Sequence, residues 1–338
     1  MTRQLRTMGL IAALVVLLTA CGTGSESSAE PAESEGGAPA SQPAASEAAS
    51  DDVVIGFSQA NGGDVWRINQ TNNVETYCAE YMPGAEIIVT DAQGDEAKQD
   101  ADVDDLIARG IDVLLLTPLT AEALTPAAQR ALDAGIPVIT LDRAVDIEVT
   151  QHIGADNKLI GRTAAQFIAE TLFGGEGGRI IEIQGVLGAS ATTDRHDEFV
   201  AWLEENAPNV EIVANQTGEY RREPAQAYMD DMLQRFGPGE FDVVYAHNDE
   251  MALGALQSLE AAERTDGVQV VGIDGQNEAI EAIADGRMAA TFTYDNAGKE
   301  ACESASKLVA GEEIEPTWVL ETNQIDSTNA EDWVGKGF

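Results

Sequence analysis

From Val53 onward the chain alternates short apolar runs with longer helix-like segments, and this alternation limits the folds open to it. The apolar runs predict buried strands, because they are rich in β-branched residues and end at polar or turn-forming residues. Strands are expected over 53–58, 86–91, 111–117, 137–141, 179–184, 211–214, 242–246 and 268–273, and helices over 65–81, 96–109, 121–134, 159–172, 193–206, 223–236, 250–262 and 279–285. Such a pattern predicts an α/β fold with parallel sheets, covered by helices on both faces and joined by right-handed crossovers.

The length of 338 residues suits two domains of similar size, and a hydrophobic fraction of 44% is enough for two cores. Polar residues follow the expected strands in both halves, at 58–61, 117–120 and 142–143 and again at 184–185, 247–249 and 274–275. In open parallel sheets ligands bind outside the carboxyl ends of the strands. Two domains that face each other would bring these ends to one cleft, a preferred place for a ligand.

The stretch Phe241–Leu256 shows this arrangement most clearly. An apolar run ends at His247, and an alanine- and leucine-rich helix follows Glu250. We expect Asn248 at the ligand cleft, with Asp249 or Glu250 capping the helix. The alternative is that the whole cluster forms a solvated turn. Among the other strand ends the ligand interpretation is favoured, and His247 is given no catalytic role.

The formal net charge of -40 excludes several classes of partner. Nucleic acids and anionic membrane surfaces need clusters of Lys and Arg, and the chain has only 19 basic residues. The sequence also has no P-loop, no GxGxxG after the first strand, no Cys/His cluster with metal spacing and no GxSxG nucleophile motif. We therefore expect no cofactor and no metal. A carboxylate pair for glycoside hydrolysis stays open, because Asp and Glu are common throughout.

The N-terminus predicts export and lipid attachment. Arg3 and Arg6 precede an apolar segment over 8–18, and the order Leu-Thr-Ala-Cys at 18–21 resembles the bacterial lipobox. This implies a signal peptide over 1–20, cleavage before Cys21 and acylation of Cys21, which would hold the protein at a membrane. Residues 21–52 are mostly Ser, Ala, Glu, Pro and Gly, a composition that predicts a disordered tether. Acylated Cys21 is the membrane contact that we expect.

Two cysteines remain after Cys21, Cys78 and Cys302, both in segments that are expected to be helical. An exported protein meets conditions in which a disulfide persists. The alternative is two buried thiols that act as small hydrophobic side chains.

The side chains near the strand ends suit a neutral ligand with many hydroxyl groups. Asp142 and Asn248 offer planar acceptors, and Arg143 and Arg195 offer planar donors that can hold two oxygens at once. Trp66 offers an apolar face for the C–H side of a sugar ring. The alternatives are a surface ion pair for Asp142 and Arg143, a helix-surface position for Arg195 and core packing for Trp66.

Several motifs then identify a family resemblance. They are VVIGFSQAN followed by Trp66-Arg67, GIPVITLDR at 135–143, GADN at 154–157, IEIQGVLGASATTDR at 181–195, YAHNDEMALGAL at 245–256 and VVGIDG at 270–275. In this order they resemble the ribose/galactose class of ABC-transporter sugar-binding proteins, and within it the galactofuranose-binding branch. The resemblance covers 53–312. It implies type I periplasmic-binding-protein architecture, with two Rossmann-like lobes joined by three crossings, and assigns 53–157 and 293–321 to lobe 1 and 158–292 and 322–338 to lobe 2.

The resemblance also implies a set of ligand contacts. Two more positions, Ser58 and Gln59, match the furanose-type phrase FSQ, and Tyr220 falls where ribose-binding proteins place a stacking phenylalanine. Residues Thr291–Asn296 match the family pattern poorly, so no contact is expected from them. The implied contact residues are Ser58, Gln59, Trp66, Arg67, Asp142, Arg143, Arg195, Tyr220, Asn248 and Asp274.

The implied function is a non-enzymatic, monomeric lipoprotein on the outer face of the cytoplasmic membrane. It would bind a monosaccharide, a galactofuranose-like or related furanose or pyranose, by hinge closure and deliver it to the permease and ATPase of an importer. A lipoprotein that feeds a signalling receptor and an exported glycosidase are the alternatives. A sugar-responsive repressor is excluded, because residues 1–52 contain no basic helix-turn-helix.

Overall fold

The structure is a computed structural model that describes residues 53–338. The predictions for 1–52, namely the signal peptide, the acylated Cys21 and the tether, lie outside the described residues. Within 53–338 no helix has both the length and the hydropathy needed to cross a membrane.

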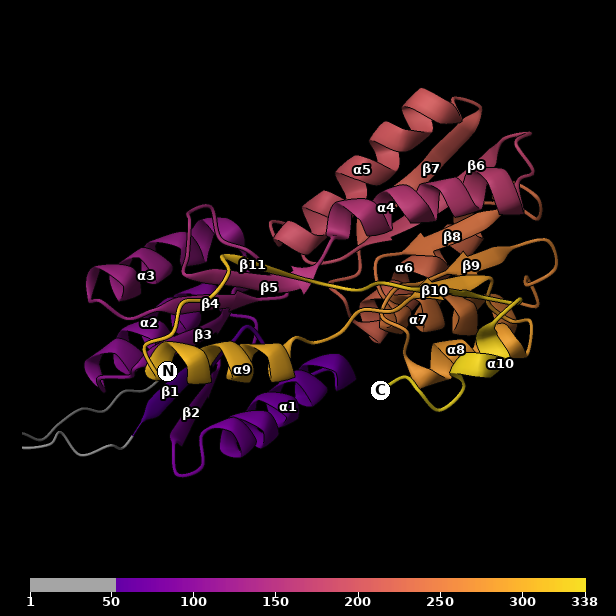
Figure 1. Cartoon of the computed structure of the whole chain (residues 1–338). Coiled ribbons are helices and arrows are strands. Elements are labelled where there is room, and N and C mark those ends of the chain that lie inside the picture. The colour runs from indigo at the N-terminus through magenta and orange to yellow at the C-terminus, as the bar shows by residue number, and fades with distance from the viewer. Residues whose placement is uncertain (1–52) are drawn as a thin grey trace, which may run out of the picture. The chain divides into compact units, whose positions relative to one another are not determined.

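Strands and helices alternate along the described chain, as predicted (Figure 1). The strands are β1 Val54–Gln59, β2 Glu86–Asp91, β3 Val113–Thr117, β4 Val138–Leu141, β5 Gln151–Ala155, β6 Gly178–Gln184, β7 Val210–Thr217, β8 Val243–Ala246, β9 Gln269–Val271, β10 Ala290–Phe292, β11 Thr317–Leu320 and β12 Gln324–Asp326. The α-helices are α1 Val65–Tyr81, α2 Glu96–Ala108, α3 Ala121–Asp133, α4 Asn157–Gln166, α5 Ser190–Asn206, α6 Arg222–Arg235, α7 Asp249–Ala261, α8 Asn277–Ala284, α9 Gly298–Val309 and α10 Ala330–Trp333. A π-helical turn, η1 Phe167–Leu172, continues α4.

The strands form two six-stranded sheets. Sheet A has the order β11-β5-β4-β3-β1-β2, and all its strands are parallel. Sheet B has the order β12-β10-β9-β8-β6-β7, and it is parallel except where β12 pairs antiparallel with β10. We call the unit built on sheet A lobe 1 and the unit built on sheet B lobe 2. The α/β fold class predicted from the sequence is confirmed.

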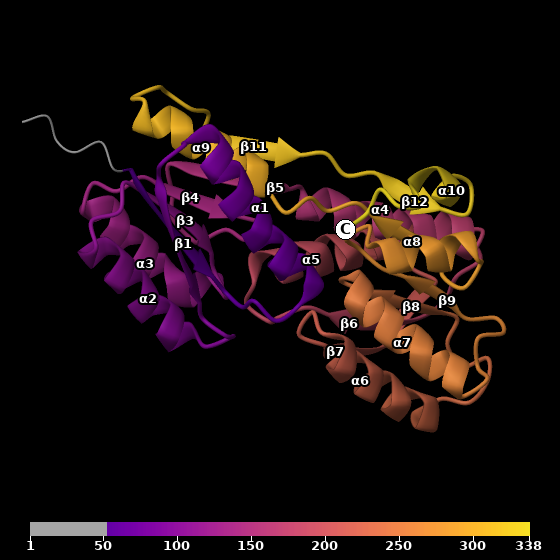
Figure 2. The same cartoon turned by 90° about the horizontal axis from the view of Figure 1, so that it is seen from below.

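Each sheet is buried on both faces, which explains the continuous apolar runs of its strands. In β3, Val113 and Leu115 pack toward α1 and α9, while Leu114 and Leu116 pack toward α2 and α3. Figure 2 shows these two helix pairs on opposite sides of sheet A. Sheet B is covered in the same way, by α4 and α5 on one face and by α6, α7 and α8 on the other.

The described chain passes between the sheets after β5, after β10 and after β11. The second passage, 293–297, is fastened to α1 of lobe 1. Gln70 donates to the carbonyl oxygen of Asn296 at 2.8 Å, and Trp66 Nε1 donates to the carbonyl oxygen of Tyr294 at 3.0 Å. The predicted lobe boundaries fall at these passages, and the division into domains stays a prediction.

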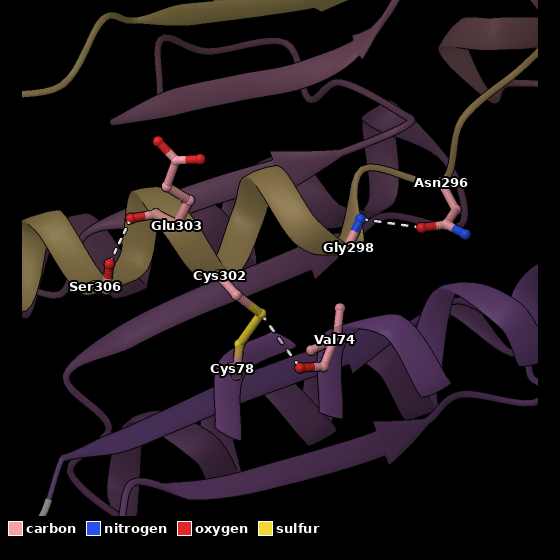
Figure 3. The surroundings of a disulfide bond; sticks show 7 residues. All are labelled: Val74, Cys78, Asn296, Gly298, Cys302, Glu303 and Ser306. Atoms are coloured by element: carbon pink, nitrogen blue, oxygen red, sulfur yellow. Dashed lines mark hydrogen bonds between the residues drawn. A yellow bond between two sulfur atoms is a disulfide. The ribbon is translucent and has the colours of Figure 1, made fainter. Parts of the chain in front are cut away.

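A disulfide joins Cys78 of α1 to Cys302 of α9 (Figure 3). Both residues are fully buried, and the two helices lie side by side over sheet A. Of the two alternatives that the sequence left open, the structure has the disulfide.

Several segments differ from the sequence-based prediction, which gave no bounds for any element after α8. Strand β5 was missed, because its residues run directly into the GADN motif that reads as a turn. The helix expected over 159–172 begins earlier, at Asn157, where Asp156 caps it by accepting from the Leu159 N–H at 3.0 Å. It then changes to π-helical geometry from Phe167.

Candidate ligand-binding site

A cavity lies where the carboxyl ends of strands from both sheets meet. Its empty space measures about 390 Å³, part of it open to solvent. The lining residues are Asn61, Asp64, Trp66, Arg67, Asp142, Arg143, Ala191, Arg195, Tyr220, Asn248, Asp274 and Tyr294. Eight of the ten contact residues that the family resemblance implies are therefore together in one cavity.

On the lobe 1 side, the start of α1 places an aromatic ring and a cation at the cavity. Asp64 caps the helix by accepting from the Arg67 N–H at 2.8 Å, so Trp66 and Arg67 lie in its first turn. The guanidinium of Arg67 lies 4.6 Å from the centre of the Trp66 ring and covers one of its faces.

Asp142 is the centre of the polar network on this side. It accepts from Arg67 at 2.6 Å and from the Tyr294 hydroxyl at 2.6 Å. Burial would raise the pKa of Asp142, but Arg67, Arg143 and the Tyr294 hydroxyl outweigh burial and hold that pKa below its ordinary value. Asp142 is therefore an ionised acceptor. The ion pair expected at this position exists, but it is buried and Arg67 is its main partner.

Arg143 and Arg195 are fully buried cations that are only partly satisfied by protein groups. Arg143 donates to the carbonyl oxygen of Leu119 at 3.0 Å, and its Nε lies 3.6 Å from Asp142 but has no hydrogen-bond partner among the described residues. Arg195 donates from Nε to Asn157 at 2.8 Å and from Nη1 to the carbonyl oxygen of His247. The helix-surface alternative for Arg195 is wrong, since the residue is 2% exposed.

Asn248 is itself the N-cap of α7, which corrects the expectation that Asp249 or Glu250 would cap this helix. Its side-chain oxygen accepts from the Met251 N–H at 3.0 Å, and its amide donates to the carbonyl oxygen of Tyr220 at 3.2 Å. Asp249 is instead buried and accepts from the Thr291 hydroxyl. Asn248 has the extended backbone of a cap residue, which places its side chain against the first N–H groups of the helix.

Three of the predicted contact residues have positive φ angles, a conformation that is uncommon for residues other than glycine. The φ angles are 65° at Asp142, 61° at Tyr220 and 131° at Asp274. Such strained backbone is found most often at functional sites, where the surrounding structure holds it in place. The Tyr220 ring lies directly over Gly185, where even a Cβ atom would come within 2.0 Å of it.

Asp274 differs from the other cavity carboxylates, because its side chain takes no hydrogen bond from residues 53–338. Burial, and then the nearby charge of Asp249, raise its pKa well above the ordinary value. Its oxygens face the cavity and are open to a ligand donor.

Tyr294 is the main cavity residue that the sequence analysis missed. No contact was expected from Thr291–Asn296, yet the Tyr294 hydroxyl donates to Asp142 and accepts from Asn157 at 3.2 Å. Crossing segments have no hydrophobic period, so nothing in the local pattern marked this residue. Asn61, Asp64 and Ala191 were also missed, although a cap signal at Asp64 precedes α1.

Ser58 and Gln59 do not line the cavity. Gln59 donates to Gln70 at 2.9 Å, and the Ser58 hydroxyl accepts from Gln99 at 3.3 Å, so both side chains serve packing between β1 and its neighbours. Gln59 contacts α1 and Ser58 contacts α2, the helices on the two opposite faces of sheet A.

The cavity can bind a polar, uncharged molecule of several hydroxyl groups. Its three arginines and its carboxylates offer donors and acceptors in comparable number, and Trp66, Tyr220 and Tyr294 add aromatic surface. Residues 53–338 contain no group of three or more His, Cys, Asp or Glu side chains arranged to hold a metal.

Comparison with known proteins agrees with this geometry. Residues 55–313 match the family described as periplasmic binding protein domain. The ribose import binding protein of Escherichia coli is 38% identical over 245 residues, which is 72% of this chain and 80% of that protein. The galactofuranose-binding protein of Escherichia coli is 30% identical over 241 residues, 69% of this chain and 74% of that protein.

Among solved structures, the fructose-binding periplasmic domain of a hybrid two-component system superposes with a TM-score of 0.78. It is 32% identical and covers 84% of this chain and 94% of that domain. The predicted resemblance and the prediction of a binding protein rather than an enzyme are thereby confirmed. By sequence, by its two parallel sheets and by the match over 55–313, this chain belongs to the periplasmic binding protein family.

Proposed function

We propose that the chain captures a neutral monosaccharide or related polyol between its two lobes for an ABC importer. One observation carries the proposal: Asp142 and Arg143 of lobe 1 and Arg195, Asn248 and Asp274 of lobe 2 line the same cavity. A ligand that contacts both lobes favours the state in which the lobes are closed, because that state satisfies more of its hydroxyl groups.

The choice of a neutral polyol follows from how the charges are paired. Arg67 is neutralised by Asp142, while Arg143 and Arg195 keep N–H groups for ligand oxygens and Asp274 keeps its acceptors. Each sugar hydroxyl both donates and accepts, so it can satisfy both kinds of group. The ribose and galactofuranose relatives are named for ligands of this type.

The experiment is a thermal-shift and calorimetry screen with D-ribose, D-galactose, D-fructose, L-arabinose, xylitol and myo-inositol. A compound present at about 100 times its Kd should stabilise the protein by about 2.7 kcal/mol. Asp142→Ala and Asn248→Ala should each weaken binding by about tenfold or more, because each leaves buried partners unsatisfied. Asp231→Ala, an exposed change on α6, is the control. Unchanged affinity in both cavity variants would place the site elsewhere.

We also propose that the protein is exported and anchored through an acylated Cys21, acting as a monomer. The motif at 18–21 supports the anchor, and the family supports export. Replacing Cys21 with serine should move the protein from the detergent phase to the aqueous phase in a Triton partition assay. An unchanged partition would contradict the anchor.

A second candidate function is delivery of the sugar signal to a sensor instead of a permease. The fructose-binding relative is the periplasmic domain of a two-component system, which makes this alternative specific. Deleting the importer permease separates the two: uptake of the bound sugar is lost if the chain serves transport, and it persists if the chain serves only signalling.

A further inference from the structure

Glu182 is a fully buried carboxylate of sheet B, and it does not line the cavity. It lies on β6, between the neighbouring strands β7 and β8 (Figure 1). Its side chain contacts His196 Nδ1 at 2.8 Å, His247 Nε2 at 3.0 Å and the Asn215 amide at 2.6 Å. A fully buried carboxylate is costly unless it is paired in this way, so its position calls for an explanation.

The two histidines are each adjacent in sequence to a cavity residue. His196 follows Arg195 in the first half of α5, and His247 precedes Asn248 at the end of β8. Arg195 also donates to the carbonyl oxygen of His247, which closes a ring of contacts. One carboxylate therefore ties together the two segments from which Arg195 and Asn248 reach the cavity.

The hydrogen bonds define the protonation of the three groups. A carboxylate only accepts, so the hydrogen bonds to Glu182 place a hydrogen on His247 Nε2 and on His196 Nδ1. The side-chain amide nitrogen of Gln184 also lies 2.7 Å from His196 Nδ1. Burial lowers the pKa of His247, so its ring is neutral, whereas the hydrogen bond to Glu182 raises the pKa of His196. Burial opposes the ionisation of Glu182, but the hydrogen bonds to His196 and His247 prevail and lower its pKa to about 2.

The other charged or titratable groups near this network come from three elements. Arg195 and Asp197 lie on α5, Tyr245 lies on β8 and Tyr228 lies on α6. None of these four side chains donates a hydrogen bond to Glu182.

We propose that Glu182 is a positioning residue of the ligand site. Through His196 and His247 it fixes the positions of Arg195 and Asn248 relative to each other. This rests on the proposed binding of a polyol in the cavity. Binding groups keep their geometry only when the residues behind them fix their position, so losing the anchor should weaken binding without removing any group that touches the ligand.

The test separates positioning from general stability. Glu182→Gln keeps the shape and removes the charge, and it should raise the Kd for D-ribose, with D-fructose and myo-inositol run in parallel, by about tenfold or more. Ile283→Ala, a cavity-forming change in the α8 core, is a matched destabilised control that should lower the melting temperature and leave the Kd unchanged. Glu204→Gln, which removes an exposed charge from α5, should change neither.

A Kd for Glu182→Gln equal to that of the wild type, measured where both are folded, overturns the proposal. If Glu182→Gln does not fold, His196→Gln takes its place with the same expected loss of affinity, because it leaves Glu182 bonded to His247 and Asn215.

Nuclear magnetic resonance of the chain's three histidines gives a readout that needs no sugar. His196 should titrate above its ordinary pKa in the wild type and lower in Glu182→Gln, and an ordinary value in the wild type overturns the proposal.

If the proposed sugar-binding function is wrong, the wild type itself binds no sugar, which distinguishes that failure from failure of the positioning proposal. If the wild type binds none of the three probes, hydrogen exchange decides the positioning proposal on its own. Faster exchange at 192–196 and 246–250 in Glu182→Gln than in Ile283→Ala supports it, and equal exchange overturns it.

Discussion

Asp274 shows, at the scale of a single residue, how ligand binding and stability oppose each other. Its carboxylate is 8% exposed, has no hydrogen-bond partner among the described residues, and lies close enough to Asp249 for the charge of Asp249 to disfavour its ionisation. Burying an ionisable group without a partner costs free energy. A site that must receive ligand donors has to leave such acceptors open.

Asp274→Asn should therefore make the protein more stable and bind sugar less well. The substitution removes the carboxyl that burial and Asp249 disfavour, and it replaces an acceptor with a group that also donates. We expect a higher melting temperature by calorimetry near pH 7 and a Kd raised by about tenfold or more for the sugar identified in the screen. Asp231→Asn, an exposed change on α6, should change neither quantity. A variant that is less stable than the wild type would contradict this account of Asp274.

Three of the cavity residues that sequence reasoning found stand close behind a strand. Asp142, Arg143 and Asn248 stand where an apolar run ends, so a parallel sheet brings them to its binding edge. Tyr294 lies in a passage between sheets, where its place depends on contacts with Asp142 and Asn157 that are 152 and 137 residues away. Such long-range contacts leave no local pattern.

At the scale of elements, α1 and α9 act as one unit although more than 200 residues separate them. The Cys78–Cys302 disulfide has a sequence separation of 224, and Asn296, just before α9, bonds to Asn69 and Asn73 of α1. The passage that leads into α9 is thereby attached to the helix that carries Trp66 and Arg67. These links, together with the buried side chains of α1, hold one wall of the cavity in lobe 1.

Replacing both cysteines with serine should lower the stability of the protein. A cross-link that closes so long a loop restricts the unfolded chain, and its loss costs about 2–4 kcal/mol. Calorimetry should show a melting temperature lower by several degrees, and dithiothreitol should give the wild type the same value while leaving the double variant unchanged. An unchanged melting temperature after complete reduction would show that the disulfide adds no stability.

Among the elements, those through α8 followed from the sequence except β5, whereas no bounds were predicted for the elements after α8. Helix α1 and strand β2 were predicted with their observed bounds, because apolar spacing and the Pro83-Gly84 turn define them. Strands β10 and β12 have three residues each, too few to show a period of two, and they exist through their pairing with each other and with β9.

At the scale of the whole molecule, charge is the most unusual property. The chain has 59 acidic and 19 basic residues, and many acidic side chains on the surface have no cationic partner within 53–338. A net charge far from zero keeps a protein soluble, but it destabilises the compact state through self-repulsion. Part of the stability gained from the two cores is therefore lost to repulsion at low ionic strength.

Sodium chloride should consequently stabilise this protein. Raising ionic strength from about 0.1 M to about 1 M shortens the screening length from about 10 Å to about 3 Å, which weakens repulsion between surface carboxylates. We expect the melting temperature to rise by several degrees across this range. A triple variant, Glu80→Gln, Glu205→Gln and Glu281→Gln, removes three exposed charges that form no ion pair in the structure. It should melt higher than the wild type at low salt and gain less from added salt. If the wild type and the variant respond equally, salt acts through something other than these charges, and self-repulsion would not be the cost of this composition.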